Sequence, residues 1–289
     1  MDIEAIVNQV LEALESEKSE KARVSSAPID MDGGKQTARQ IDFNEEKVVG
    51  VDNPVDQELI GKVRSITPAR IGIGRTGTRM KTRDYLHFRI DHAAAQDAVF
   101  KGVSDEFLEH LNLPILQSKA GSMEEYLMNL DSGRVLDNVS REWAEANLTK
   151  DKQVQIVISD GLSSTGIEAN IPDLLPALMQ GLKVKGISVG EPVFIKRSRV
   201  WIQDEIASIT NCDVVISLIG ERPGLATSKS ISAYLIYRPT KDTVEADRSV
   251  ISNIHDGGIP PVEAGAFLAD LIGEILKHKA SGVKLAQLK

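Results

Sequence analysis

The spacing of apolar residues at the start of the chain predicts one short amphipathic helix, at residues 1–17. Its apolar positions recur three and four residues apart, and acidic side chains fill much of the remaining surface. A polar stretch without apolar period follows at 18–44 and predicts a flexible linker. A tethered helix cannot bury its apolar side alone, so we expect it to dock on its own domain or on an external partner. The apolar positions are Ile3, Ile6, Val7, Val10, Leu11 and Leu14.

The pattern from 45 to 150 predicts a mainly helical part without a convincing strand. Helical spacing covers 55–66 and 82–100, and further helical segments continue to about residue 148. A glycine-rich loop at 67–79 separates the first two helices.

From 151 to 289 the pattern changes to strands that alternate with helices. The strands are nearly all apolar, which is typical of a mostly parallel sheet covered by helices on both faces. Pro172 and Pro176 limit the regularity of the first helix, and Gly282 is placed to follow the end of the last. The predicted strands are 154–158, 192–196, 213–219 and 233–237, and the predicted helices are 166–182, 200–210 and 261–279.

Composition narrows the class of protein. Asp and Glu outnumber Lys and Arg by 42 to 34, and a net charge of −8 disfavours a nucleic-acid partner. No apolar run approaches the roughly 18 residues of a membrane span, and the N-terminus lacks the pattern of a secretory signal. Cys212 is the only cysteine, so neither an internal disulfide nor a thiolate zinc site can form within the chain.

Gly72, Gly74 and Gly77 match the G-x-G-x-x-G pattern of dinucleotide-binding loops. That fingerprint needs a preceding strand and an acidic residue about 20 positions further on, at the tip of a second strand. Neither is predicted here, so we favour a loop packed against its own helix or a partner chain. A nucleotide-binding regulatory protein using 72–77 is the alternative function.

Polar residues on the 82–100 helix offer a second candidate. His87 and Asp91 lie four residues apart and share a helix face, together with nearby Asp84, Arg89 and His92. Two ligands on one helix do not make a metal or acid–base site. A salt-bridged helix face is the preferred interpretation.

Ligands of parallel sheets bind beyond the carboxyl ends of the strands, so the turns after Ile158 and Ile219 are the places to search. Hydroxyls at 159–165 could help to hold an anion, although Ser163 is equally suited to cap the next helix. Glu221 follows the clearest strand and could accept a hydrogen bond from a ligand amide or pair with Arg222.

The polar stretch 245–258 is long for a simple connection. It could be a binding loop or a subunit contact, and its His255 is better explained as a loop histidine than as a ligand. No nucleophile–base pair, metal cluster or complete cofactor fingerprint emerges, which favours a binding or partner subunit over a stand-alone enzyme.

Six blocks in order resemble the signature segments of the ethanolamine ammonia-lyase light chain, and the resemblance covers about residue 55 to the end. The blocks are Thr67-Pro-Ala-Arg-Ile-Gly-Ile-Gly-Arg-Thr-Gly77, Asp91-His-Ala-Ala-Ala-Gln-Asp-Ala-Val99, Ser159-Asp-Gly-Leu-Ser163, Leu218-Ile-Gly-Glu-Arg-Pro-Gly-Leu225, Thr243-Val-Glu-Ala-Asp-Arg248, and Ile251-Ser-Asn-Ile-His255 through Pro260-Pro-Val-Glu-Ala264.

The resemblance implies a Rossmann-like chain that closes over the corrin ring of adenosylcobalamin at the interface with a large, barrel-shaped catalytic subunit. There, cleavage of the cofactor's cobalt–carbon bond starts the radical conversion of ethanolamine to acetaldehyde and ammonia. The chain lacks an Asp-x-His-x-x-Gly segment, in agreement with the family's base-on cobalamin binding.

Carried over by residue, the cobalamin contacts fall on Val200, Glu221 and Val250. Val250 departs from the family, whose members carry cysteine there; an apolar contact could survive that change, but a polar one could not. No catalytic or metal-binding residue is expected in this chain. The family also implies a cytoplasmic complex inside a bacterial microcompartment, for which 1–17 would be the encapsulation tag.

Overall fold

A computed structural model describes residues 49–240 and 242–288. The residues from Val49 onward belong to one compact unit. The predicted helix at 1–17 and linker at 18–44 lie outside the described residues. None of the helices that the structure describes is both long and apolar enough to cross a membrane.

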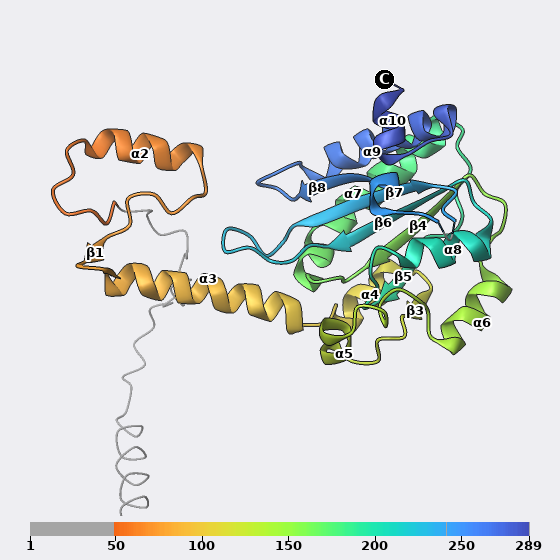
Figure 1. The fold of residues 1–289 in the computed structure, drawn as a ribbon, viewed down its shortest axis with the longest axis horizontal. Coiled ribbons are helices and arrows are strands. Elements are labelled where there is room, and N and C mark those ends of the chain that lie inside the picture. The colour runs from red at the N-terminus through yellow and green to blue at the C-terminus, as the bar shows by residue number, and fades with distance from the viewer. Residues whose placement is uncertain (1–48, 241, 289) are drawn as a thin grey trace, which may run out of the picture. The chain divides into compact units, whose positions relative to one another are not determined.

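A six-stranded sheet organises the second half of the chain (Figure 1). Its strand order is β3-β5-β4-β6-β7-β8, and the three pairings among β3, β5, β4 and β6 are parallel. β7 and β8 then add to β6 as antiparallel strands. The predicted mostly parallel sheet is therefore confirmed. The strands are β3 Ile115–Gln117, β4 Val154–Ser159, β5 Val193–Lys196, β6 Val214–Gly220, β7 Ile231–Tyr237 and β8 Ser249–Ile254.

Helices cover both faces of this sheet, as an α/β fold requires. α7 (Ser164–Val184) and α9 (Pro261–His278) pack on one face, over the side chains of Ile156, Ile216 and Leu235. α8 (Ile202–Thr210) and α6 (Asn138–Asn147) pack on the other, over the side chains of Val157, Val215 and Ile236. Figure 1 shows the two groups of helices on opposite sides of the strands.

The N-terminal part is mainly helical, as predicted. α2 begins after Asp56, whose carboxylate accepts a hydrogen bond from the backbone N–H of Leu59. A short hairpin, β1 (Arg75–Thr76) with β2 (Arg79–Met80), stands between α2 and α3. The helices are α2 Gln57–Ile66, α3 Thr82–Phe100, α4 Asp105–Leu111, α5 Met123–Met128 and α6.

The prediction of no strand before residue 150 is wrong. β3 lies at one edge of the main sheet and pairs with β5, with Leu116 opposite Ile195. It is three residues long, which is too short for an alternating or apolar run to stand out.

The two prolines inside α7 do not interrupt it. Pro172 and Pro176 are four residues apart and both are exposed, so the missing N–H groups fall on the solvent side of the helix. The opposite side is buried and apolar, and its buried apolar residues are Ile167, Ile171, Leu174, Leu178 and Leu182.

Two C-terminal boundaries also differ from the prediction. α9 ends at His278, and its left-handed capping residue is Lys279, with φ of 51°. Gly282 instead opens a further helix, α10 (Gly282–Gln287).

The polar stretch 245–258 contains a 3-10 turn, η1 (Glu245–Asp247), and the edge strand β8.

Candidate functional site

The turns that follow β4 and β6 meet at the carboxyl edge of the sheet. The backbone N–H of Leu162 donates to the carbonyl of Gly220 at 3.0 Å. Gly161 has a positive φ of 54°, and a side chain there would overlap the backbone of Gly220. The two turns singled out from the sequence are thus in direct contact.

Glu221 stands at this edge with its carboxylate held in place. Oε1 accepts hydrogen bonds from the hydroxyl of Ser232 at 2.5 Å and from the backbone N–H of Asn253 at 2.9 Å. Burial alone would raise the pKa of Glu221, but these hydrogen bonds and the nearby His255 hold it below its ordinary value. A fixed, ionised acceptor results, and neither of these two hydrogen bonds involves Oε2.

Val250 lies on β8, opposite Tyr234 of β7, and is 44% exposed. Alternation along the strands places Ser252 and Ser232 on the same side, where their hydroxyls are 2.8 Å apart. We call this group, together with Glu221, the β7–β8 surface. It belongs to the sheet face that α8 covers only in part.

Val200 occupies the turn just before α8 and is half-buried. The turn is anchored to the end of β4, because Oδ1 of Asp160 accepts the backbone N–H of Arg197 at 2.7 Å. Asp160 is 5% exposed, and burial raises its pKa despite the hydrogen bonds that it accepts. The position of Val200 is thus set by a buried carboxylate.

A buried polar network links α8 to β7 and β8. The amide of Gln203 donates to the backbone carbonyl of Tyr234 at 2.8 Å and accepts from Arg248 at 2.9 Å. Arg248 also binds Asp204 on the first turn of α8. The network fixes the first turn of α8, which begins two residues after Val200, against β7 and the residue just before β8.

The sequence could not indicate this network. Gln203, Asp204 and Arg248 fall in segments where a polar residue is equally common at the surface. Only Asp204 at the start of a predicted helix carries a recognisable signal, since acidic residues favour the first turn.

The other candidates have structural roles. Ser163 caps α7 by accepting the N–H of Gly166 at 2.9 Å, and its hydroxyl also donates to the carbonyl of Ser228 at 2.5 Å. Thr165 donates to the same carbonyl. The hydroxyls considered for an anion therefore hold the loop after β6 against α7.

The glycine-rich loop packs on its own chain. Gly74 donates its N–H to Asp84 of α3 at 2.9 Å, and Gly50 donates to the carbonyl of Gly72 at 2.8 Å. The loop runs into a hairpin rather than from a strand into a helix, so the nucleotide fingerprint lacks its structural context.

The α3 face is salt-bridged, as the preferred interpretation held. Asp91 pairs with Arg70, and Asp84 lies 3.8 Å from Arg83.

In the loop after β8, Nε2 of His255 lies 2.9 Å from Oδ1 of Asn253, and Nδ1 of His255 accepts the N–H of Gly257. Within residues 49–240 and 242–288, no three His, Cys, Asp or Glu side chains gather as metal ligands would.

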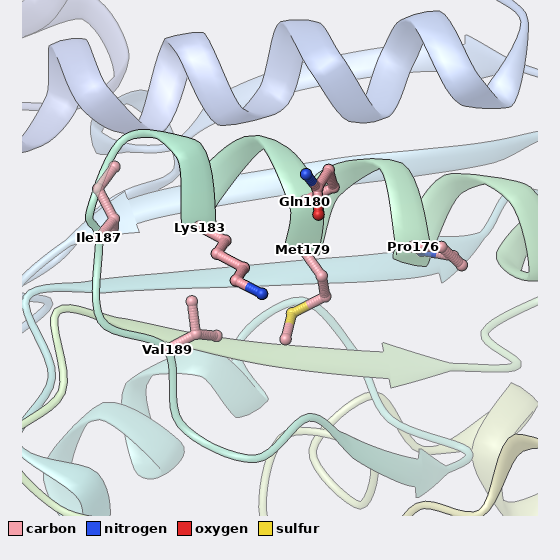
Figure 2. Close-up of a pocket in the computed structure, with 6 residues that line it drawn as sticks. All are labelled: Pro176, Met179, Gln180, Lys183, Ile187 and Val189. Carbon is pink, nitrogen blue, oxygen red and sulfur yellow. The ribbon is translucent and has the colours of Figure 1, made fainter.

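A separate groove of about 430 Å³ lies beside α7 (Figure 2). Figure 2 shows the side chains of Met179 and Lys183 directed from α7 toward Val189. The lining of this groove is mostly apolar and includes none of the three predicted contact residues. The lining residues are Pro176, Met179, Gln180, Lys183, Ile187 and Val189.

Comparison with known proteins agrees with the six sequence blocks. Residues 57–286 match the family model of the ethanolamine ammonia-lyase light chain. An ethanolamine ammonia-lyase small subunit from Listeria monocytogenes is 48% identical over 240 residues, covering 83% of this chain and 82% of the relative. The small subunits from Clostridium tetani and Clostridioides difficile are 44% and 41% identical; the alignments cover 98% of this chain in both cases, and 98% and 97% of the relatives.

Proposed function

Since the chain belongs to the ethanolamine ammonia-lyase light-chain family and is a subunit of that lyase, we propose that it holds one face of adenosylcobalamin against the large subunit. In this proposal Val200, Glu221 and Val250 contact the cofactor. The chemistry on ethanolamine, which yields acetaldehyde and ammonia, is carried out by groups of the large subunit.

The observation that supports this proposal most is the state of Glu221. An ionised carboxylate whose Oε1 is fixed by Ser232 and Asn253 can present its other oxygen in a constant direction. Amide N–H groups surround the corrin ring, and a carboxylate is a strong acceptor for them. Its role is to fix the orientation of the ring.

The rest of the β7–β8 surface suits the same ligand. Val250 is exposed and apolar, as a contact with the methyl-bearing edge of a corrin requires. Two strands away on β6, Ser217 pairs with the same Tyr234 from the other side; it is 2% exposed and its hydroxyl has no hydrogen-bond partner among the described residues. A buried hydroxyl without a partner is costly, and an amide-rich ligand could supply one.

When bound, adenosylcobalamin would supply the radical that starts the reaction. The residues of this chain would bind and orient it, while Val200 and Val250 exclude water from its edge. The carboxylate of Glu221 is already held by Ser232 and Asn253, so little ordering of this side chain is required on binding, which favours affinity.

The proposal is tested by co-expressing the chain with the large subunit. Cobalamin-dependent deamination of ethanolamine should require both chains, and undiminished activity of the large subunit alone would overturn the proposal. Glu221→Ala should weaken cobalamin binding by about tenfold, as the loss of one charge-assisted hydrogen bond implies. Glu263→Ala, an exposed change on α9 at the opposite sheet face, is the matched control and should bind normally.

We also propose that residues 1–17 direct the complex into a bacterial microcompartment. The support is their apolar spacing followed by the polar stretch 18–44. Deleting residues 1–20 should release the lyase from purified compartments and leave its specific activity unchanged. Retention of the truncated protein would contradict the proposal.

A further inference from the structure

The loop between β8 and α9 contains an Asp-Gly pair beside a histidine. In Asp-Gly the backbone nitrogen of the glycine can attack the aspartate side chain readily, because glycine has no side chain to hinder the approach. The pair occurs three times in the sequence, at 32–33, 160–161 and 256–257. The first pair lies outside the described residues, so the structure compares the other two.

The pair at 256–257 is exposed, and its carboxylate is unrestrained. Both residues are exposed, in a turn closed by the hydrogen bond from the N–H of Gly258 to the carbonyl of His255 at 2.9 Å. Within the described part of the chain, the side chain of Asp256 forms no hydrogen bond and no ion pair. It can therefore rotate toward the nitrogen of Gly257 without losing a contact.

The pair at 160–161 is buried and fixed. Asp160 is 5% exposed, and its Oδ1 accepts the backbone N–H of Gly161 at 3.0 Å and that of Arg197 at 2.7 Å. Gly161 also packs against the backbone of Gly220. A reaction at this carboxyl group would require the buried turn to open first. The pair at 160–161 is thus an unreactive reference within the same chain.

His255 is placed to accept the proton that has to leave the nitrogen of Gly257. An amide nitrogen becomes a nucleophile only as it loses its proton, and Nδ1 of His255 accepts this N–H at 3.1 Å. In the neutral ring the proton is then on Nε2, which lies 2.9 Å from Oδ1 of Asn253. Asn253 therefore orients the ring with its unprotonated nitrogen toward the amide, as a third group orients the base in many enzymes.

We propose that Asp256 is a site of spontaneous isoaspartate formation and that His255 is the base that promotes it. The nitrogen of Gly257 bonds to the carboxyl carbon of Asp256 while its proton passes to Nδ1 of His255. One carboxyl oxygen then leaves as water, which carries that proton and a second one from solvent. Water later opens the cyclic imide at either carbonyl and yields aspartate or isoaspartate, so no oxidant or reductant is needed.

Isoaspartate at 256 lengthens the backbone between β8 and α9 by one carbon atom. The N–H of Ile259 donates across this turn to the carbonyl of Asn253 at 2.9 Å, and the N–H of Asn253 donates to Oε1 of Glu221. The rearrangement therefore alters the loop that holds the carboxylate of Glu221. The inference does not depend on the proposed function, because the reaction involves only groups of this loop and water.

The test follows the three Asp-Gly pairs during incubation of the full chain at neutral pH. Cleavage after Lys and Arg places the pairs in three different peptides, whose isoaspartyl and imide forms are separated by chromatography and identified by mass spectrometry. In the folded chain isoaspartate should form at 256 at least about tenfold faster than at 160, because the buried turn reacts only when it opens. In urea this difference should disappear. Equal rates in the folded chain would overturn the assignment of the site.

His255→Ala tests the base. Isoaspartate formation at 256 should slow at least about fivefold in the folded chain, a small part of what a positioned base contributes in enzymes, and should not change in urea. If the hydrogen bond from Gly257 only stiffens the turn, the variant should react faster instead. An unchanged or faster rate would therefore overturn the role of His255.

Two controls accompany this variant. His110→Ala removes an exposed histidine from α4 and should leave the rate at 256 unaltered. Asp256→Glu keeps the charge but requires a larger ring, so the reaction at this position should stop. In every variant the peptide with Asp160 reports on folding, because it stays unreactive only while the buried turn is intact.

Discussion

Arg248 and Asp204 form an ion pair in which the arginine side chain is almost completely buried. One terminal nitrogen of the guanidinium lies 2.8 and 2.9 Å from the two carboxylate oxygens, and the arginine side chain is 2% exposed. Burial raises the pKa of Asp204 despite its bonds to Arg248. The pair joins the first turn of α8 to the residue just before β8, and so links the helix that follows Val200 to the strand that carries Val250.

Replacing Arg248 by methionine should destabilise the chain by about 3 kcal/mol, because Asp204 would keep a partly buried charge without its partner. Urea unfolding measures this loss. Arg238→Met is the control, since Arg238 pairs with Asp213 at the surface with its side chain 66% exposed, and its loss should destabilise the chain far less. Equal losses of stability for the two variants would show that the buried pair stabilises the fold no more than the exposed pair does.

Gly220→Ala should destabilise the carboxyl edge of the sheet by about 3 kcal/mol or prevent folding, as overpacking of backbone does. A Cβ at Gly220 would overlap the backbone carbonyl oxygens of Asp160 and Ser163. Gly102→Ala, where a Cβ would meet nothing, should leave the midpoint of thermal unfolding within a few degrees. Comparable stability of both variants would contradict the close approach of the two turns.

Glu221→Gln should change how stability depends on pH. The pKa of Glu221 is lowered in the folded chain, so its charge stabilises the fold above the ordinary carboxylate pKa of about 4.3, and this contribution is lost as pH falls through the folded value. The difference in unfolding temperature between the original chain and the variant should be constant above about pH 5 and shrink below about pH 4. A difference independent of pH would refute the assignment.

Variants at Val250 would distinguish an apolar from a polar contact with the proposed cofactor. Val250→Cys should keep cobalamin affinity within about twofold, whereas Val250→Asp should lower it at least about tenfold because a charge would lose water in the contact. Spectroscopic titration of the assembled lyase with cobalamin measures both. Loss of affinity in the cysteine variant would show that the site is more specific than an apolar contact.

The sequence predicts best the elements whose burial is uniform. β4 and β6 are buried at every position, so their apolar runs are unmistakable. β8 is an edge strand with exposed Val250 and Ser252, and its mixture of polar residues resembles a loop. Edge strands need fewer apolar residues, which explains why the pattern missed it.

The residues of the candidate site also differ in how far the sequence predicts them. Glu221 could be found by reasoning, since a charged residue directly after a buried strand points to a ligand site. Val200 and Val250 could come only from family resemblance, because a single valine carries no chemical signal. The bond between Arg248 and Asp204 joins residues 44 positions apart, and no local pattern reports such a contact.

The central place of β4 also bears on how the chain is synthesised. β4 pairs with β5 and β6, and both follow it along the sequence. A nascent chain that has passed residue 159 but not residue 193 therefore presents an apolar strand with both edges unpaired, and one edge stays unpaired until β6 is synthesised. Such a strand can pair with other unfinished chains, so association between nascent chains is favoured most in this interval.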